Sequence, residues 1–356
     1  TIPVGNLPGG VSVNPDGFKV YVTNWYDSTV SVINTATNTV SATIKVGEDP
    51  YGIAVSPTGS KVYVADYYAD TVRVINSATN TVSAKIAVGN AIQGMAVSPD
   101  GSRLYVVNYS GASVNAISTA TNTVLDTITV GYDPYGIAIS PNGKKIYIAN
   151  EDDATVSIIN SAVDTVTTTI PVGNSPIGLA ISPNGKKIYV TNYADNTVSV
   201  IDTATNTVTA TITVGQYPQG ISVSPDGSNI LVANYSDNSV SVISSTTNTV
   251  TATIMVGAGP IAFGNFISSY ITTSFALLSS VSESIAVYPN PAINYLTIEN
   301  PKNAEIEITN MQGQLIKTFS TTGNKTNIDV SAFANGVYVV EVKTEKGIAV
   351  KKFVKE

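Results

Sequence analysis

The chain contains neither histidine nor cysteine among its 356 residues. A Ser/His/Asp or Cys/His triad, an imidazole proton shuttle, a zinc finger and a disulfide are therefore excluded. Any chemistry has to use carboxylates, hydroxyls, amides or lysines. The 25 acidic and 18 basic residues leave a formal net charge of −7, which argues against a nucleic-acid partner, because such a partner requires a basic surface. We therefore expect no nucleic-acid binding, no metal site and no cofactor.

Aromatic and acidic side chains with a regular spacing are the candidates that remain. Tyr51, Gln93, Tyr135 and Gln219 stand at multiples of 42 residues from one another, and Asp49 and Asp133 precede the two tyrosines. Flat aromatic rings beside carboxylates suit sugar rings, whose hydroxyls donate to the acids, and they also suit cationic peptides. The predicted ligand-binding residues are Tyr51, Tyr132, Tyr135, Tyr217, Gln93, Gln219, Asp49, Asp133 and the single tryptophan, Trp25.

The elements that position these residues follow from an internal repeat. A Val-Gly dipeptide recurs seven times, from Val4-Gly5 to Val256-Gly257, and every step is 42 residues. A period of about 40 to 45 residues is typical of propeller blades, whereas helical repeats would show apolar spacing near 3.6. The first repeat alternates apolar and polar residues over 10–13, 19–23, 29–33 and 39–46, with turns rich in Asn, Asp, Gly and Pro between them. These runs predict four antiparallel strands.

The fold class is therefore all-β, with a seven-bladed β-propeller over residues 1–267. Six complete four-stranded blades of 42 residues run from about residue 10 to residue 254. We expect an incomplete seventh blade that the two ends share, with 1–5 as its outer strand and 261–267 as its inner strand. Its middle strands come from 270–276 or from residues upstream of Thr1. Pairing of the two ends would close the ring and remove exposed sheet edges.

Propeller geometry sorts the loops onto two faces. The loops from the second to the third strand, and from the fourth strand to the next blade, share one face, here called the acidic face. These loops carry eleven acidic residues, ten tyrosines and Trp25 without a lysine or arginine, whereas Lys19, Lys61, Arg103 and their equivalents enter from the opposite face. The acidic face is the predicted binding surface, although tyrosines packed between blades and aspartates that cap turns would give the same pattern.

Two other site hypotheses rest on these carboxylates. Asp49 and Asp133 could form a catalytic pair, but a glycosidase needs its two carboxylates about 5 to 9.5 Å apart, and residues two blades apart could exceed that. The run Glu151-Asp152-Asp153 lacks the spaced oxygen ligands and the glycine of a dedicated calcium loop, so solvated turn charge is the preferred interpretation.

The repeats resemble the YVTN-repeat β-propellers of prokaryotic surface-layer and secreted proteins. This family also includes the YncE-like propellers. The resemblance rests on Tyr21-Val22-Thr23-Asn24, on Tyr189-Val190-Thr191-Asn192 and on Ser-Pro-(Asp/Asn)-Gly turns such as the one at Ser98. It implies the fold, but a propeller hosts many activities. Lyases and copper reductases that resemble this repeat use histidine, and sialidase-like propellers use three arginines, whereas this chain has only Arg73 and Arg103.

A second module follows a Ser-rich linker at 268–283. Residues 284–356 alternate apolar and polar positions with frequent turns, which predicts a small Ig-like β-sandwich. This segment resembles the type A C-terminal sorting domain of the Bacteroidota type IX secretion system. The resemblance implies export, the secretion machinery as a partner, and a location outside the cell or on its outer surface. The residues that carry it are Tyr288, Pro289, Asn290, Pro291, Gly336, Tyr338, Lys351, Lys352 and Phe353.

The sequence therefore predicts a secreted cell-surface propeller that binds a glycan or a protein at its acidic face. One alternative is a carbohydrate-active or lactonase-like enzyme that uses Asp49 and Asp133. Another is a passive surface-coat scaffold. No apolar run of 18 or more residues predicts a transmembrane segment. No signal peptide is recognisable at Thr1, so a leader would have been removed before this residue.

Overall fold

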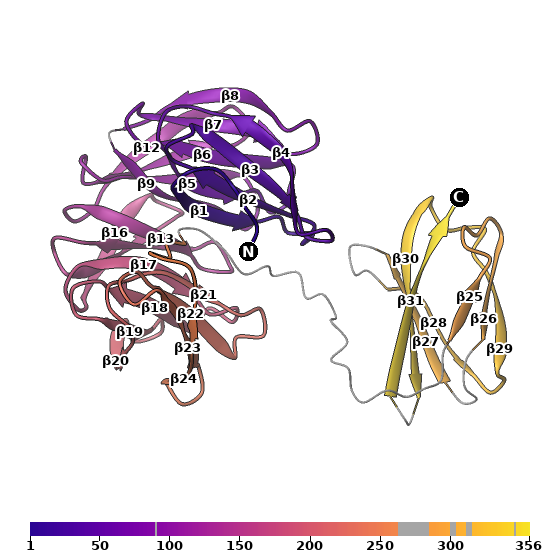
Figure 1. The fold of residues 1–356 in the computed structure, drawn as a ribbon. Coiled ribbons are helices and arrows are strands. Elements are labelled where there is room, and N and C mark those ends of the chain that lie inside the picture. Colours follow the sequence, from indigo (N-terminus) through magenta and orange to yellow (C-terminus); the bar gives the residue numbers. More distant parts are fainter. Residues whose placement is uncertain (90, 263–284, 300–303, 311–314, 345–346) are drawn as a thin grey trace. The chain divides into compact units, whose positions relative to one another are not determined.

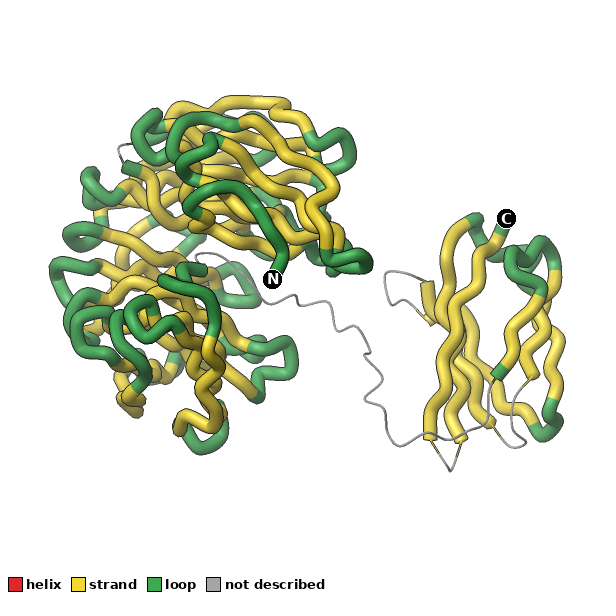
Figure 2. Tube along the Cα trace, in the orientation of Figure 1, coloured by secondary structure: helices red, strands yellow, loops and turns green. Residues whose placement is uncertain are grey.

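The structure is a computed structural model that describes residues 1–89, 91–262, 285–299, 304–310, 315–344 and 347–356 (Figure 1). The chain divides into two compact units, Thr1–Ile271 and Thr272–Glu356. Strands, turns and loops make up all of these described ranges (Figure 2). Within them, no helix is long and apolar enough to cross a membrane.

The first unit contains six antiparallel four-stranded sheets, each built from one repeat with its strands in chain order. These sheets are the six predicted blades. The first three comprise β1 Pro8–Val13, β2 Lys19–Asn24, β3 Thr29–Asn34, β4 Thr39–Lys45, β5 Pro50–Val55, β6 Lys61–Asp66, β7 Thr71–Asn76, β8 Thr81–Ala87, β9 Ile92–Val97, β10 Arg103–Asn108, β11 Ser113–Ser118 and β12 Thr123–Thr129. The others comprise β13 Pro134–Ile139, β14 Lys145–Asn150, β15 Thr155–Asn160, β16 Thr165–Pro171, β17 Pro176–Ile181, β18 Lys187–Asn192, β19 Thr197–Asp202, β20 Thr207–Thr213, β21 Pro218–Val223, β22 Asn229–Asn234, β23 Ser239–Ser244 and β24 Thr249–Met255.

The first strand of each blade is the inner strand, and each packs against the inner strand of the next blade, from β1 through β21. A glycine makes this approach possible. A Cβ atom on Gly52 would overlap the carbonyl oxygen of Gln93, and one on Gly136 would overlap that of Ile177. The same contact recurs at the equivalent glycine of every blade, so only glycine fits there.

A hydrophobic core fills each of the five interfaces between consecutive blades. Between blades one and two, Tyr21, Val32 and Ile44 pack against Ile53 and Val62, all of them buried. Equivalent clusters fill the four interfaces that follow. The alternating pattern of the sequence thus places every second side chain of the middle strands between two sheets.

Basic residues add a second link between blades. Lys19, Lys61, Lys145 and Lys187 each donate from Nζ to a backbone oxygen 58 residues further on, in the next blade, over 2.7–3.2 Å. Arg103 does the same toward Ser161 at 3.3 Å. The basic side chains of the face opposite the acidic face therefore link neighbouring blades.

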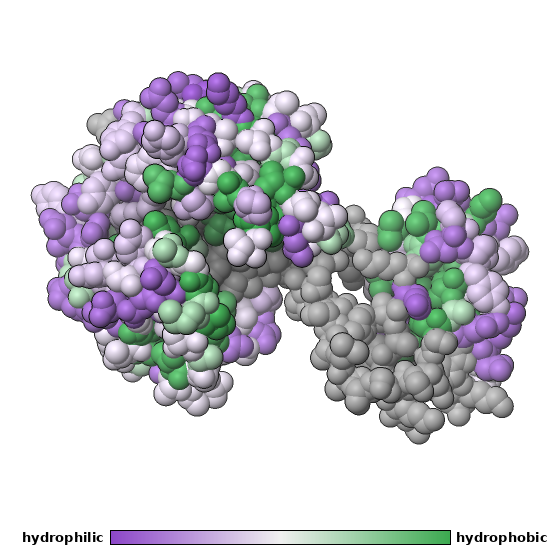
Figure 3. Space-filling view, viewed as in Figure 1, coloured by the Kyte–Doolittle hydropathy of each residue, from purple (hydrophilic) through white to green (hydrophobic). Residues whose placement is uncertain are grey.

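The sixth blade has a flank that no described blade covers. Ile254 in β24 is 50% exposed, whereas its five equivalents, which the next blade covers, are only 3–5% exposed. Hydrophobic residues gather on the surface over β24 and the strands beside it (Figure 3). The propeller unit thus presents an apolar flank where a seventh blade would pack.

The predicted seventh blade is only partly visible. Residues 1–4 form no strand, so the expected outer strand is not present in the described N-terminal segment. Ala262 places its carbonyl oxygen against Gly220, as the carbonyl of the next inner strand does in every other blade. Most of the predicted inner strand and the segment 270–276 lie outside the described residues. The seventh blade remains a prediction.

The second unit contains two antiparallel sheets. One has the order β25 Ala286–Tyr288, β26 Tyr295–Glu299, β29 Lys325–Asp329, and the other has the order β28 Leu315–Thr321, β27 Ala304–Asn310, β30 Gly336–Thr344, β31 Gly347–Lys355. Buried residues of both sheets, including Leu296, Ile306 and Phe353, form one hydrophobic core. Two sheets around a common core are what the alternating pattern predicts.

Candidate functional site

The loops of the acidic face start each inner strand from a strained backbone position. Asp49 and Asp133 have φ angles of 51° and 47°, and Tyr217 at the equivalent position of blade six has 53°. This left-handed conformation is uncommon for residues other than glycine, and aspartate tolerates it better than most. The two aspartates therefore have a local structural reason for their positions.

Five aromatic residues on this face, here called the aromatic cluster, are linked by ring contacts: Trp25, Tyr51, Tyr67, Tyr109 and Tyr135. Tyr68 adjoins the cluster edge-on to Tyr67, at 4.7 Å between ring centroids. Trp25 lies edge-on to Tyr51 at 5.3 Å between ring centroids, and it lies 5.9 Å from Tyr67. Tyr51 is 6.4 Å from Tyr135, which is 6.0 Å from Tyr109. Edge-to-face spacings of this size are favourable for aromatic pairs. The cluster spans loops of the first four blades.

A hydrogen bond joins Tyr51 and Tyr135, the two rings of the cluster that stand on inner strands. The hydroxyl oxygens of Tyr51 and Tyr135 lie 2.7 Å apart. Tyr51 is only 7% exposed, so it serves as a wall of the site and offers little contact area. Burial raises the pKa of Tyr51 to about 12 and raises the pKa of Tyr135 well above its ordinary value. Both phenols are neutral hydrogen-bonding groups at physiological pH.

Two carboxylates converge on the edge of the aromatic cluster. The carboxylates of Asp133 and Glu151 lie close enough to the Tyr109 hydroxyl to influence its pKa, which burial raises first and the two charges raise further. Burial, followed by the charge of Asp133, raises the pKa of Glu151. A phenol has one proton to donate, so Tyr109 alone cannot donate to both carboxylates. The carboxylate that approaches Asp133 is Glu151, and no contact joins Asp133 to Asp49 within the described ranges.

Most of the other acidic residues on this face accept hydrogen bonds from backbone N–H groups. Asp27, Asp153, Asp195 and Asp237 each accept a hydrogen bond from a backbone N–H 21 residues earlier, over 2.7–2.8 Å. These bonds lower the pKa of Asp27 and Asp195. Asp66 does not belong to the surface at all, because it is fully buried and paired with Arg73 at 2.6 Å. These five aspartates therefore stabilise the local structure, and their presence does not by itself indicate a ligand.

The remaining predicted site residues are not part of the aromatic cluster, although Gln93 lines the same cavity as Tyr51 and Tyr135. Tyr217 stacks on Tyr193 at 4.8 Å between centroids, on blades five and six. Tyr132 is 68% exposed, whereas Gln93 is 7% exposed. Gln219 is partly exposed on β21. The sequence interpretation left Glu151, Tyr67 and Tyr109 out of the site, although all three stand in the loops whose asymmetry it noted.

The run Glu151-Asp152-Asp153 separates into three environments. Glu151 is half-buried beside Tyr109, Asp152 is exposed, and Asp153 caps the backbone of Tyr132. Across the described residues, no three acidic side chains come together in a way that could hold a metal ion.

In the second unit, two of the predicted sorting residues are buried in the core, and a third forms a hydrogen bond between a turn and a strand. Tyr338 and Phe353 are buried and stack at 5.4 Å, and the Tyr338 hydroxyl donates to the Ala334 carbonyl. Asn290 accepts a 2.8 Å hydrogen bond from the backbone N–H of Val354, which ties the Tyr288-to-Pro291 turn to β31. Pro289 and Pro291 lie exposed in that turn, Gly336 begins β30, and Lys351 is exposed on β31.

Both units match known protein families. The family described as YNCE-like beta-propeller matches residues 53–150 and 142–300. The chain belongs to the YNCE-like β-propeller family. Residues 286–356 match the family described as a secretion system C-terminal sorting domain, which confirms the predicted resemblance to the type IX sorting domain. This YNCE-like propeller is therefore an exported protein, secreted or held at the cell surface, and its sorting domain implies contact with the secretion machinery.

Solved structures share the propeller fold at low identity. A hydrazine synthase of Kuenenia stuttgartiensis superposes with a TM-score of 0.66 at 20% identity, covering 74% of this chain and 90% of that one. A functionally unknown protein of Desulfotomaculum acetoxidans DSM 771 gives 0.64 at 15% identity, covering 74% and 91%. Identities this low show the fold alone. No curated protein is detectably similar in sequence.

Proposed function

We propose that this secreted YNCE-like propeller is a binding protein whose ligand contacts the aromatic cluster on the acidic face. The observation that carries the proposal is the continuity of the cluster: Trp25, Tyr51, Tyr67, Tyr109 and Tyr135 follow one another at 5.3–6.4 Å between centroids. Trp25, Tyr67, Tyr109 and Tyr135 remain partly exposed, so solvent or a ligand can reach them. Grouped aromatic surfaces on exported proteins usually mark contacts.

The chemistry at the edge of the cluster limits the ligand. Asp133 and Glu151 accept hydrogen bonds and carry negative charge, and the loops of this face contain no lysine or arginine. Sugar hydroxyls donate to carboxylates while the CH faces of the ring stack on aromatic rings. Cationic side chains of a protein would satisfy the same groups. A glycan or a cationic protein segment is the proposed ligand, and anionic ligands are disfavoured.

The experiment compares the full chain with variants on a glycan array and on an array of cationic peptides. Trp25→Ala with Tyr67→Ala removes the outer side of the cluster, and Tyr295→Ala, 63% exposed in the other unit, is the matched control. We expect the double variant to lose at least about tenfold in affinity, equivalent to 1.4 kcal/mol, and the control to bind as the wild type does. Wild-type binding that survives the double variant contradicts the proposal. Absence of any wild-type ligand would favour a passive surface scaffold.

A carboxylate-based hydrolase is the second candidate, and the neighbouring Asp133 and Glu151 favour it over a pair that includes Asp49. Burial and the charge of Asp133 raise the pKa of Glu151, as is common for a general acid. Turnover of chromogenic glycosides or lactones that disappears in Glu151→Gln would support this activity. Turnover retained in that variant would exclude Glu151 as the acid.

A further inference from the structure

One position of the acidic face is aromatic in every described blade except blade four. This position directly follows the second strand of each blade, and its residues stand 42 apart in the chain. In each blade its backbone N–H donates, over 2.9–3.2 Å, to the carbonyl of the positive-φ residue that precedes the inner strand. The residues at this position, here called the crown, are Trp25, Tyr67, Tyr109, Glu151, Tyr193 and Tyr235.

Glu151 has the same backbone surroundings as the five aromatic residues of the crown. Its N–H donates to the Asp133 carbonyl at 3.0 Å, just as the N–H of Tyr109 donates to the Ala91 carbonyl at 3.0 Å in the preceding blade. The glutamate therefore replaces an aromatic residue between Tyr109 in blade three and Tyr193 in blade five. Glu151 and these two tyrosines are all partly exposed, so a ligand can reach them.

The carboxylate of Glu151 lies in surroundings that favour a cation. Burial is the first cause of the raised pKa of Tyr109 and of Tyr193, and the charge of Glu151 raises both pKa values further. Burial also raises the pKa of Glu151 itself, and the charge of Asp133 is the second cause. No ion pair joins Glu151 or Asp133 to a cation of the described residues. A cation beside this partly desolvated carboxylate would stabilise its charged form.

The aromatic residues on either side of Glu151 favour the same kind of ligand. A cation within about 6 Å of a tyrosine ring is attracted by the electron-rich face of the ring. Tyr109 lies edge-on to Tyr135 at 6.0 Å between centroids, and Tyr193 stacks on Tyr217 at 4.8 Å. Each ring thus packs against a second ring, which reduces the conformational entropy that it would lose when a ligand binds.

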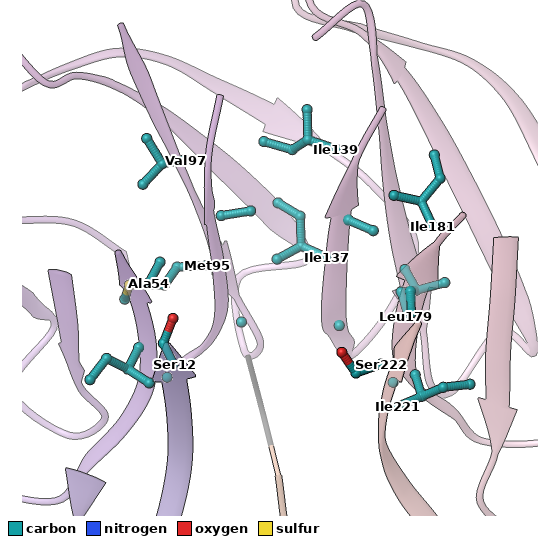
Figure 4. Close-up of a pocket in the computed structure, with 18 of the residues that line it drawn as sticks. Ser12, Ala54, Met95, Val97, Ile137, Ile139, Leu179, Ile181, Ile221 and Ser222 are labelled. Carbon is teal, nitrogen blue, oxygen red and sulfur yellow. The ribbon is translucent and has the colours of Figure 1, made fainter. Parts of the chain in front are cut away.

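The cavity of about 540 Å³ between the inner strands offers no comparable counter-charge. Aliphatic side chains of these strands, among them Val97, Ile139 and Ile181, line it (Figure 4). None of the described residues that line it is charged. A cation that entered such surroundings would lose hydration without gaining a partner, which is strongly unfavourable. Of these two places, the crown is the one that suits a cation.

We propose that the crown binds an organic ammonium cation, with Glu151 as its counter-charge and Tyr109 and Tyr193 on either side of it. This inference rests on the proposed function and narrows its ligand to a molecule or side chain that carries an ammonium group. Because the other crown residues are aromatic, the single carboxylate determines where around the crown the cation lies. A small quaternary ammonium compound and a lysine side chain share this chemistry.

Calorimetric titration of the full chain with two matched probes tests the need for a charge. Choline carries a quaternary ammonium, and 3,3-dimethyl-1-butanol has the same shape with carbon in place of nitrogen. We expect choline to bind at least about tenfold more tightly than the alcohol. Nα-acetyl-lysine amide distinguishes the two sources of the cation: tighter binding of choline indicates a quaternary small molecule, and tighter binding of the lysine derivative indicates a protein side chain.

Variants of Glu151 locate the counter-charge. Glu151→Gln keeps the size of the side chain and removes its charge, so it should abolish the preference for choline over the alcohol. Glu151→Tyr installs the residue that four other blades have at this position, and it should abolish the preference as well. Glu48→Gln, which changes an exposed glutamate of the same face, is the matched control and should keep the preference.

Variants of Tyr193 test the contribution of the aromatic ring. Tyr193→Leu should weaken choline binding about threefold or more, because it removes the ring face. Tyr193→Phe keeps the ring and should bind choline as the wild type does. Tyr26→Leu, at a tyrosine of the same face that is 76% exposed, is the matched control and should leave choline binding unchanged. Thermal melts of all variants check that they fold.

Several results would overturn the proposal. If choline and the alcohol bind equally, or if neither binds up to its solubility limit, the crown is not a cation site. If Glu151→Gln keeps the preference for choline, Glu151 is not the counter-charge. The proposed function survives these failures if a glycan binds the wild type and is lost in Trp25→Ala with Tyr67→Ala. Choline binding that needs Glu151 but survives this double variant would instead support the cation site and contradict the role of the outer cluster.

Discussion

The hydroxyls of Tyr51 and Tyr135 meet at 2.7 Å although 84 residues separate them in the chain. The two tyrosines begin the inner strands of blades two and four, and Gln93 begins that of the blade between them. A single hydrogen bond therefore spans a whole blade and joins the two rings of the aromatic cluster that stand on inner strands.

Removal of this bond should weaken the propeller without disturbing its rings. Tyr51→Phe and Tyr135→Phe should each lower the free energy of unfolding by about 0.5–1.5 kcal/mol. The double variant should lose less than the sum of the two, because the shared bond is counted in both single variants. Denaturant unfolding followed by Trp25 fluorescence measures this, since the only tryptophan reports on the first unit. Strictly additive losses would show that the bond contributes nothing.

Glu151 should make the propeller sensitive to pH. Its pKa is raised in the folded state by burial and by Asp133. Stability linked to this group is therefore complete below the unfolded pKa and is lost as pH rises through the folded pKa. Glu151→Gln removes the charge, so we expect the variant to be more stable than the wild type at pH 7 and equal to it near pH 3. Denaturant midpoints at the two pH values measure the difference.

Glu48→Gln is the matched control for this experiment. Glu48 is an exposed glutamate of the same face. It should change the midpoint little at either pH, because exposed charges contribute little. If Glu151→Gln is destabilising at pH 7, Glu151 has a structural partner and the repulsion with Asp133 is not the dominant effect.

The sequence predicted the blades well because the repeat is regular. Six copies of one pattern act as an internal alignment, so the strand positions around Tyr21 apply equally to Tyr63 and Tyr189. The asymmetry of the two faces was predictable for the same reason. The set of residues that form the site was not predictable. Side chains such as Tyr109 and Glu151 meet across neighbouring blades, and their contact depends on backbone geometry that cannot be read from the repeat period. The burial of Asp66 was missed because its strand position looks like a loop boundary.

Blade two departs from the repeat at two coupled positions. The second strand of every other blade ends in asparagine, as at Asn24, whose amide donates to Thr29 and Ser31. Blade two has Asp66 there and Arg73 in place of the serine. The carboxylate accepts from Arg73 at 2.6 Å and from the backbone of Gly47 at 3.1 Å. The ion pair thus replaces an amide–hydroxyl pair within the same backbone frame.

A double-mutant cycle tests this coupling. Arg73→Ser should be destabilising by about 3–5 kcal/mol, because it leaves the buried carboxylate of Asp66 without its cation. Asp66→Asn should be destabilising by less, since the Arg73 side chain is 25% exposed and reaches solvent. The double variant restores the asparagine–serine pair and should return to within about 1 kcal/mol of the wild type. Denaturant unfolding followed by Trp25 fluorescence gives all four values, and a double variant as unstable as Arg73→Ser would contradict the coupling.

Two equivalent isoleucines test whether the ring of blades is closed. One lies in the last interface between described blades, and the other lies on the flank of blade six that no described blade covers. Ile212 in β20 is 5% exposed beneath blade six, whereas Ile254 in β24 is 50% exposed. Ile212→Ala should lower the free energy of unfolding by about 2–5 kcal/mol, the usual range for a buried isoleucine. Ile254→Ala should lower it by less than about 1 kcal/mol, because half of its side chain already contacts water. Trp25 fluorescence during denaturant unfolding measures both. Equal losses would mean that the flank of blade six is covered in solution, as the predicted seventh blade requires, whereas a clear difference would leave that flank available to another partner.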